Sequence, residues 1–378
     1  MGHWYREAGL SLLLLALVNG QCHFTLDETK SSKFGFLTYR EAAGADHMQR
    51  QGVVPNGATI YMNCHDPKKP KTGVVKDVVC NNNQFQKPLP LCEHMKSSEV
   101  REVNDNSCPA TMFATGVEIR GQFVELFRSC YDKSNLRALF SKNIVYKNTF
   151  FGPNPNLSFD CGKVVPTRDM EAYKKEKVYD TFFNIYGSNR YIADAKTIAI
   201  SRGHLSCATE YLYRNLKCAS FKYVNVVPQF QSINGGNWKN IEKWVNSQVP
   251  VNSYLRIETG GIGVLKLPDV EGNLKPAFLL GGNQIPVPEW TYKLIKDARN
   301  QPIHAILTSN NKYGEKIPAP AFCTQIRCPG FDYTDASDQG YTYCCDARTF
   351  NPPRELIPPT VSKTPSRPNS RTRPGGAH

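Results

Sequence analysis

The chain has 378 residues and carries 46 Lys and Arg against 33 Asp and Glu, which gives a formal net charge of +13. This length allows two or three domains, and a content of 40% hydrophobic and 21% charged residues excludes a largely disordered chain. The positive excess excludes an acidic, solvating protein. It favours a polyanionic partner such as nucleic acid, a heparin-like sugar or an anionic membrane surface.

Residues 1–20 have the pattern of a secretory signal peptide. Arg6 lies in the positively charged region, Leu10 to Val18 form a short apolar run, and Val18-Asn19-Gly20 provides the cleavage region. The apolar run is too short to anchor the chain in a bilayer, which takes about 20 apolar residues, and no later segment reaches that length. We therefore expect a secreted, extracellular protein without a membrane partner; the sequence does not indicate its oligomeric state.

Residues 21–100 are expected to form a small, cysteine-containing, β-rich module. Its predicted strands are Ala58–Asn63 and the β-branched run Val74–Val79, separated by a basic turn. Residues 101–350 are expected to form the main body, with mixed strands, few long helices and therefore an α+β fold. The elements predicted for this body are strands at Gln122–Phe127, Thr197–Ile200, Gly263–Leu267, Ala277–Leu280 and Ile303–Leu307, and a helix at Asn237–Val249.

Residues 351–378 are rich in Pro, Ser, Thr and Arg and nearly free of apolar side chains. This composition is typical of a disordered basic tail, in which Arg354 and the other cations are available to a polyanion. A solvated tail without a specific task is the alternative.

Thirteen cysteines follow the expected cleavage point, which is typical of an oxidising compartment. Most should pair, and the odd count leaves at least one free thiol or an intermolecular bridge. Cys207 and Cys218 are candidates for one bridge. A zinc site is disfavoured because no Cys-x-x-Cys pair is present. Asn156-Leu157-Ser158 is an N-glycosylation sequon in a turn-rich stretch, so Asn156 is a candidate acceptor.

The most informative stretch begins with a strand that ends in Ser201-Arg202-Gly203-His204. If the strand persists through this segment, Arg202 and His204 point to the same face. An arginine can bind a phosphate through two hydrogen bonds, and a neutral histidine can take a proton from water near pH 7. Taken alone, each of these residues is more often structural than catalytic.

Two further segments follow in order: Asn225-Val226-Val227-Pro228-Gln229, and then Asn234 to Trp238 with Ile241-Glu242. Together with Arg202-Gly203-His204, this set resembles the DNA/RNA non-specific endonuclease family, whose catalytic core is the ββα-metal motif. The resemblance covers about residues 101–350 and looks closest to arthropod secreted members, salivary or gut. It implies an α+β fold with a ββα-metal nuclease core on a mixed or antiparallel sheet, preceded by the small β-rich module.

The resemblance also implies a role for each matched residue. His204 is expected to be the general base, and Asn234 the one direct protein ligand of Mg²⁺ or Mn²⁺. Arg202 is expected to hold phosphate oxygens, and Asn225 to bind substrate or support the site beside it. Glu242 is expected to take part in catalysis through metal-bound water. The implied reaction is hydrolysis of phosphodiester bonds in DNA and RNA, independent of their sequence.

Two positions depart from the family pattern. Ser201 stands where the best-known members carry Asp, and Asn246 stands where many relatives carry Arg four residues after the glutamate. A missing cation near the transition-state phosphate costs roughly a hundredfold or more in rate, so we expect reduced nuclease activity. The alternative is a secreted, high-affinity nucleic-acid binder on the same fold with weak or no cleavage. An extracellular adhesion or structural protein would leave the ordered motifs unexplained.

Overall fold

A computed structural model describes residues 20–24, 35–40, 46–66, 68, 74–94, 97–147, 158–160, 162–251 and 253–354. Residues 1–19 of the expected signal peptide, the sequon Asn156 and the expected tail from residue 355 onward lie outside the described residues, as does Cys161. None of the helices within the described residues has the length and apolar character needed to span a bilayer.

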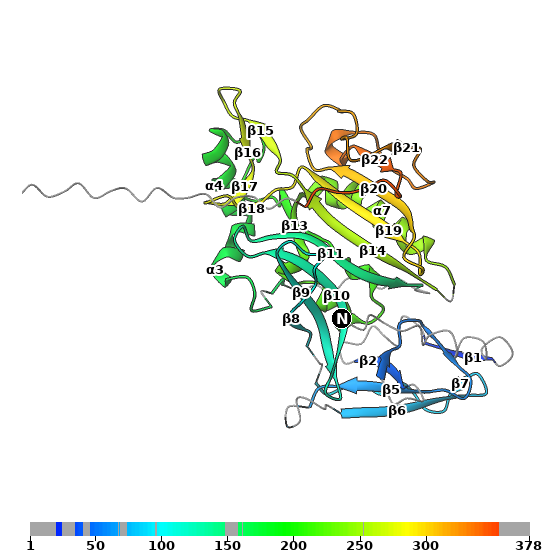
Figure 1. Ribbon diagram of the computed structural model, residues 1–378. Helices are drawn as coiled ribbons and strands as arrows, with labels where there is room; N and C mark the ends of the chain where they lie inside the picture. The colour runs from blue at the N-terminus through cyan, green and yellow to red at the C-terminus, as the bar shows by residue number, and fades with distance from the viewer. Residues whose placement is uncertain are drawn as a thin grey trace, which may run out of the picture.

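A nine-stranded antiparallel sheet forms the centre of the molecule (Figure 1). Some of its long strands are joined by tight connections, such as the Arg120-Gly121 turn between β9 and β10, where both residues have a positive φ that suits a two-residue hairpin. In spatial order the strands are β21 (Gln325–Ile326), β22 (Thr342–Cys345), β20 (Pro302–Ser309), β19 (Trp290–Lys296), β14 (Tyr254–Ile262), β11 (Arg137–Tyr146), β10 (Gln122–Asp132), β9 (Thr111–Ile119) and β8 (Glu99–Val103).

The two faces of this sheet bury different sets of side chains because neighbouring residues along a strand point to opposite sides. On β19, Trp290, Tyr292 and Leu294 enter an apolar cluster on one face. Ile295 packs on the other face, where the helix α7 (Lys239–Gln248) covers β11, β14, β19 and β20 through Ile241 and other apolar residues. The candidate site lies on this second face.

The remaining elements are short and surround the sheet. A hairpin of β12 (Ile200–His204) and β13 (Val226–Phe230) precedes α7, which completes a strand–strand–helix order. The other elements are α3 (Thr167–Met170), η1 (Glu171–Tyr173), α4 (Lys175–Tyr186), η2 (Ala208–Glu210), α5 (Arg214–Ala219), η3 (Tyr223–Asn225), α6 (Gln231–Ile233), η4 (Asn234–Trp238), β15 (Lys266–Pro268), β16 (Leu274–Pro276), β17 (Phe278–Leu280), β18 (Gln284–Pro286) and η5 (Ser337–Gln339).

The N-terminal strands form a separate five-stranded sheet, drawn in blue in Figure 1, and a small β1–β4 pair. The disulfides Cys22–Cys80 and Cys64–Cys92 hold these strands together. Their apolar cluster continues into the main body, where it includes Tyr211 to Tyr213 and Leu216. The strands are β1 (Gln21–His23), β2 (Phe36–Arg40), β3 (Asp46–Met48), β4 (Val53–Pro55), β5 (Thr59–Cys64), β6 (Val74–Asn81) and β7 (Gln84–Phe85).

The expected α+β class is confirmed, and most predicted elements occur near their predicted positions. Two strand predictions were wrong in part. The strand expected at Thr197–Ile200 begins only at Ile200 and runs on through His204. The strand expected at Gly263–Leu267 is interrupted because Gly263 has a φ of +69° and turns the chain, so that β15 starts at Lys266.

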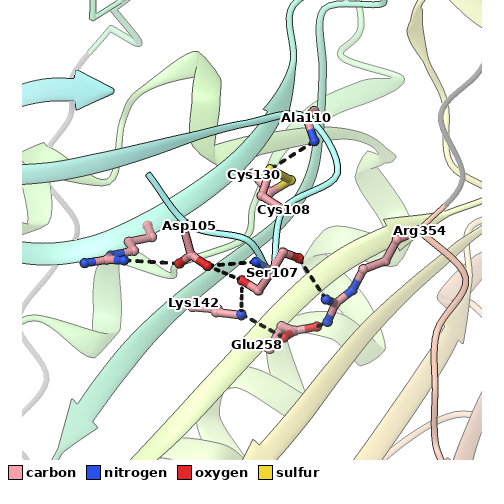
Figure 2. The surroundings of a disulfide bond; sticks show 9 residues. Asp105, Ser107, Cys108, Ala110, Cys130, Lys142, Glu258 and Arg354 are labelled. Carbon is pink, nitrogen blue, oxygen red and sulfur yellow. Dashed lines mark hydrogen bonds and ion pairs between the residues drawn. A yellow bond between two sulfur atoms is a disulfide. The ribbon is translucent and has the colours of Figure 1, made fainter. Parts of the chain in front are cut away.

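Five disulfides form among the described cysteines, and Cys108–Cys130 lies beside a partly buried polar network (Figure 2). The network corrects the expectation for Arg354. This side chain donates to Glu258 at 2.7 Å and to the Ser107 carbonyl at 3.2 Å, so it packs against the sheet instead of extending toward a polyanion. Two further disulfides, Cys323–Cys345 and Cys328–Cys344, join the segment around β21 to the strand β22.

The proposed Cys207–Cys218 bridge is wrong, because both residues are free thiols in the structure. Cys207 is buried in the loop after β12, where its sulfur lies 3.1 Å from the Thr209 hydroxyl. Cys218 lies on α5 and is half-buried.

Candidate functional site

The β12–β13 hairpin determines which side chains share a face. His204 pairs with Val226 and Ile200 pairs with Phe230, so the strand persists through the whole motif. Gly203 faces the opposite side, where a Cβ would lie 2.7 Å from the Gln229 side-chain oxygen. A glycine is therefore required for the buried Gln229 to lie against β12, while Arg202 and His204 share the other face.

Arg202 lies among aromatic rings and has no carboxylate partner within the described residues. Its Nε donates to the Tyr223 hydroxyl at 2.9 Å. Its guanidinium carbon lies 5.2 Å from the Tyr173 ring centre, 5.5 Å from that of Phe159 and 5.6 Å from that of Tyr223. The rings orient the guanidinium without neutralising it, so the positive charge remains available to an anion.

His204 contacts the same Phe159 ring as Arg202 does. The centre of its imidazole lies 5.0 Å from that of Phe159 and 4.7 Å from that of Phe221. Burial among these rings lowers the pKa of His204 from its ordinary 6.5 to about 4, so the imidazole is neutral at pH 7. Its Nε2 is buried and makes no hydrogen bond to any described residue, which leaves a proton-accepting or proton-donating atom without a partner.

Asn225 is fully buried, and backbone groups use both ends of its carboxamide. Its oxygen accepts from the Ser206 N–H at 2.8 Å, and its nitrogen donates to the carbonyls of Ser206 and Ser220, both at 2.9 Å. Asn225 thus fixes the chain two residues past His204. This placement favours the supporting role expected for Asn225 over direct contact with substrate.

Asn234 opens the π-helical turn η4, directly after α6. Gly235 and Gly236 follow it, and Gly236 has a φ of −97° and a ψ of −119°, which bends the chain before α7. The Asn234 side chain is half-buried and makes no hydrogen bond with another residue in the part of the chain that the structure describes. Its carboxamide oxygen is therefore available as a ligand for a hard cation.

Glu242 lies two turns further along, on α7. Burial raises the pKa of its carboxyl group from 4.5 to about 7, an effect opposed by the nearby ammonium of Lys293 and strengthened by the carboxylate of Glu210. Hydrogen bonds from the side chains of Cys207 and Trp238 also favour the ionised form. Glu242 therefore faces the loop that follows His204. This contact links α7 to the end of β12.

The chain leaves β13 at the end of the ladder opposite His204, and η4 and α7 then return toward the His204 loop. Two contacts mark this return: Glu242 meets Cys207, and Asn246 donates to the Thr209 hydroxyl at 3.2 Å. Arg202 and His204 thus contact the same ring, Phe159. Glu242 contacts the loop that follows His204. The structure shows no direct contact between Asn234 and His204 among the described residues.

The two departures from the family pattern have internal partners. The Ser201 hydroxyl donates to the Gln229 carbonyl at 3.1 Å, across the hairpin. Asn246 is buried, with only 4% of its surface exposed, and binds Thr209. Both side chains therefore stabilise the loop and hairpin.

The donor set fits a magnesium-like ion held mainly by water. No group of three or more His, Cys, Asp and Glu side chains able to hold a metal occurs among the described residues. If Asn234 is the one direct protein ligand and Glu242 acts through water, as the resemblance implies, this donor set would suit Mg²⁺, which keeps several waters.

Sequence reasoning missed the aromatic residues around the motif and the buried charges beneath it. Phe159 carried no local signal, because it lies 43 positions before Arg202. Lys293 did carry a local signal: it is the one charged residue in the strand run Trp290–Ile295, whose other residues are apolar or aromatic except for Thr291, and a buried cation needs a partner.

Comparisons with known proteins agree with these motifs. The family model described as DNA/RNA non-specific endonuclease matches residues 108–350, more than half of the chain. A salivary endonuclease of Lutzomyia longipalpis is 25% identical over 298 residues, which cover 75% of this chain and 71% of the relative. A salivary endonuclease of Culex quinquefasciatus is 28% identical over 312 residues, 77% of each chain.

Among solved structures, a chain from the crystal structure of the EndoG/EndoGI complex aligns with a TM-score of 0.34 and 17% identity, over 51% of this chain and 74% of that chain. The family match over residues 108–350 includes every motif of the hairpin and of α7. The chain therefore belongs to the DNA/RNA non-specific endonuclease family.

Proposed function

We propose that this protein is a secreted, Mg²⁺-dependent endonuclease that hydrolyses phosphodiester bonds of DNA and RNA without sequence preference. One observation carries the proposal: an unneutralised guanidinium, Arg202, and a neutral imidazole, His204, lie on one strand face and contact the same Phe159 ring. This arrangement binds a phosphate next to a proton acceptor, which is what hydrolysis of a phosphodiester requires.

Each side chain has a defined task in this proposal. Arg202 binds the phosphate oxygens, and His204 takes the proton from the attacking water. The negative charge of a bound phosphate raises the pKa of His204 from its low value, which makes the imidazole a stronger base when substrate is present. Asn234 would hold the Mg²⁺ or Mn²⁺ ion, and Glu242 would orient water around it; the ion supplies positive charge for the scissile phosphate and the leaving oxygen.

A cleavage assay tests the proposal. The mature protein is incubated with plasmid DNA, single-stranded DNA and double-stranded RNA, in Mg²⁺, Mn²⁺ or EDTA. Loss of all three polymers only with the metal, abolished by His204→Ala, is the expected result. Cleavage that continues in EDTA or in the His204→Ala variant would contradict it. Asn234→Ala should weaken Mn²⁺ binding, which electron paramagnetic resonance measures without any turnover.

The second candidate is a high-affinity nucleic-acid binder with weak or no cleavage. The enclosed Nε2 of His204 and the absence of an arginine at position 246 favour it, because both lower catalytic power. Retarded but intact nucleic acid in the same assay identifies this function. Under either proposal the affinity falls steeply as salt is added, since phosphate contacts release counterions.

Secretion belongs to this proposal too. It rests on the apolar N-terminal run, on five disulfides among the described cysteines and on the salivary origin in the names of the relatives. Expression in insect cells with mass spectrometry of the secreted chain would show cleavage near Gly20 and any glycan on Asn156. A mature chain that begins at Met1 would contradict it.

A further inference from the structure

Lys293 is a lysine without any solvent-exposed side-chain surface. It lies on β19, on the sheet face that carries the hairpin and α7, and its ammonium donates to the Thr259 hydroxyl at 3.0 Å. It also lies 3.5 Å from a carboxylate oxygen of Glu210, whose side chain is 1% exposed. An ammonium loses its hydration when it is buried to this extent, so these partners must replace the lost water.

Glu210 connects the Lys293 ammonium to the loop that follows His204. Its second carboxylate oxygen accepts from the Cys207 N–H at 2.9 Å and from the Asn143 side chain at 2.7 Å. Glu210 therefore ties the residue three positions after His204 to the central sheet. Without a cation beside it, this carboxylate would be a buried, unpaired charge.

On its other side Lys293 faces the helix that follows Asn234. Its ammonium lies 5.6 Å from the centre of the Trp238 ring and attracts the carboxylate of Glu242, which Glu210 repels. The charged and titratable groups around Glu242 are thus Lys293 from β19, Glu210 from η2 and the Cys207 thiol from the loop. One ammonium thus lies 3.5 Å from the Glu210 carboxylate and 5.6 Å from the Trp238 ring, and these two side chains belong to the two separate halves of the candidate site.

We propose that Lys293 is a positioning residue for the nuclease reaction: a buried ammonium that holds the His204 loop through Glu210 and the start of α7 through Trp238 and Glu242. This inference rests on the proposed function. Lys293 does not touch substrate, because its side chain has no exposed surface. Its effect should therefore fall on kcat and leave nucleic-acid binding unchanged.

The competing explanation is that Lys293 only pairs with Glu210 to stabilise the fold. Lys293→Met alone cannot separate the two, since it leaves Glu210 unpaired and destabilises the chain. Lys293→Met combined with Glu210→Gln removes both charges. We expect this double variant to regain most of the thermal stability while kcat stays at least tenfold below the wild type, with KM and oligonucleotide Kd in EDTA unchanged within twofold. Recovery of both stability and kcat would overturn the inference.

Lys142 provides the matched control. It lies on β11 with its side chain on the opposite sheet face, 3.9 Å from Glu258. Lys142→Met with Glu258→Gln removes the same two kinds of charge from the same sheet. This control should leave kcat within twofold of the wild type; an equal loss of kcat in it would show that any lysine–glutamate pair of the sheet has the same effect.

A second measurement needs no catalysis, so that failure of the proposed function can be told from failure of this inference. Glu242→Gln is introduced into the Glu210→Gln variant and into the Lys293→Met, Glu210→Gln variant, two backgrounds that differ only at Lys293, and the thermal midpoint is measured at pH 8. If Lys293 supports the Glu242 carboxylate, the change to Gln raises the midpoint more in the variant that lacks Lys293. An equal change in both backgrounds would overturn the inference even if the wild type cleaves nucleic acid.

Discussion

The carboxamide of Asn225 and the peptide of Ser206 form a reciprocal pair: the Ser206 N–H donates to the Asn225 oxygen at 2.8 Å, and the Asn225 nitrogen donates back to the Ser206 carbonyl at 2.9 Å. A single side chain in the η3 turn thus sets the backbone just beyond His204. The backbone two residues beyond His204 is therefore held by a side chain with no exposed surface.

Asn225→Ala should therefore act on the fold and on kcat. It removes three buried hydrogen bonds, each worth about 1 kcal/mol net, so we expect the free energy of unfolding to fall by about 3 kcal/mol in a urea titration. Oligonucleotide affinity in EDTA should remain unchanged. Weaker binding at unchanged stability would instead show that Asn225 touches substrate.

Gly203→Ala should disrupt the hairpin. The new methyl group would lie 2.7 Å from the Gln229 side-chain oxygen and 3.2 Å from the Val227 carbonyl, an overlap that costs about 1–3 kcal/mol. Adding Gln229→Ala should recover part of this loss, because it removes the nearer atom. Gly281→Ala is the control, since a Cβ at Gly281 meets no atom within 4 Å. Thermal midpoints of the four chains test this, and equal effects at Gly203 and Gly281 would contradict it.

The pKa of His204 should be measured by NMR on the imidazole protons. We expect a value of about 4, so the folded chain takes up this proton only near pH 4, whereas the unfolded chain takes it up near 6.5. The contribution of neutral His204 to stability is therefore complete above pH 6.5 and is lost as the pH falls toward 4. Phe159→Ala opens the ring environment and should move the pKa upward; an unchanged pKa would mean that Phe159 does not cause the desolvation.

Glu242→Gln tests a pKa that is raised by burial, whereas that of His204 is lowered. The carboxyl group has its pKa raised from 4.5 to about 7, so the folded chain retains a proton that the unfolded chain has lost between these values. Stability from this group is present below pH 4.5 and is lost as the pH rises through 7. The midpoint of Glu242→Gln minus that of the wild type should therefore increase from pH 5 to pH 8. A difference that does not vary with pH would contradict the raised pKa.

Cys207 should be inert in the folded protein. Burial and the nearby carboxylates of Glu242 and Glu210 raise the pKa of its thiol, and only the thiolate is reactive. Iodoacetamide should label Cys207 in denaturant and leave it unlabelled in native buffer, as peptide mass spectrometry shows. A disulfide-linked Cys207–Cys218 peptide would contradict the structure.

The sequence predicted the local elements of this protein better than its long-range contacts. The strand through Ser201 to His204 and the helix near Trp238 could be predicted because their signals are local periodicity and ordered motifs. The contacts of Phe159 with Arg202 and His204 could not, because they depend on how distant segments pack. The prediction of a Cys207–Cys218 disulfide was wrong for the same reason, because proximity along the chain does not bring two sulfur atoms within bonding distance.

The apolar cluster that the N-terminal strands share with Tyr211 and Leu216 limits how this protein can be divided. Recombinant production of residues 108–350 alone would expose Val117, Ile119, Tyr211 and Leu216 to solvent. An exposed apolar patch of this kind promotes aggregation. The N-terminal strands, blue in Figure 1, thus bury apolar side chains of the segment beyond His204. Homologues that lack them would have to protect the same patch by other means.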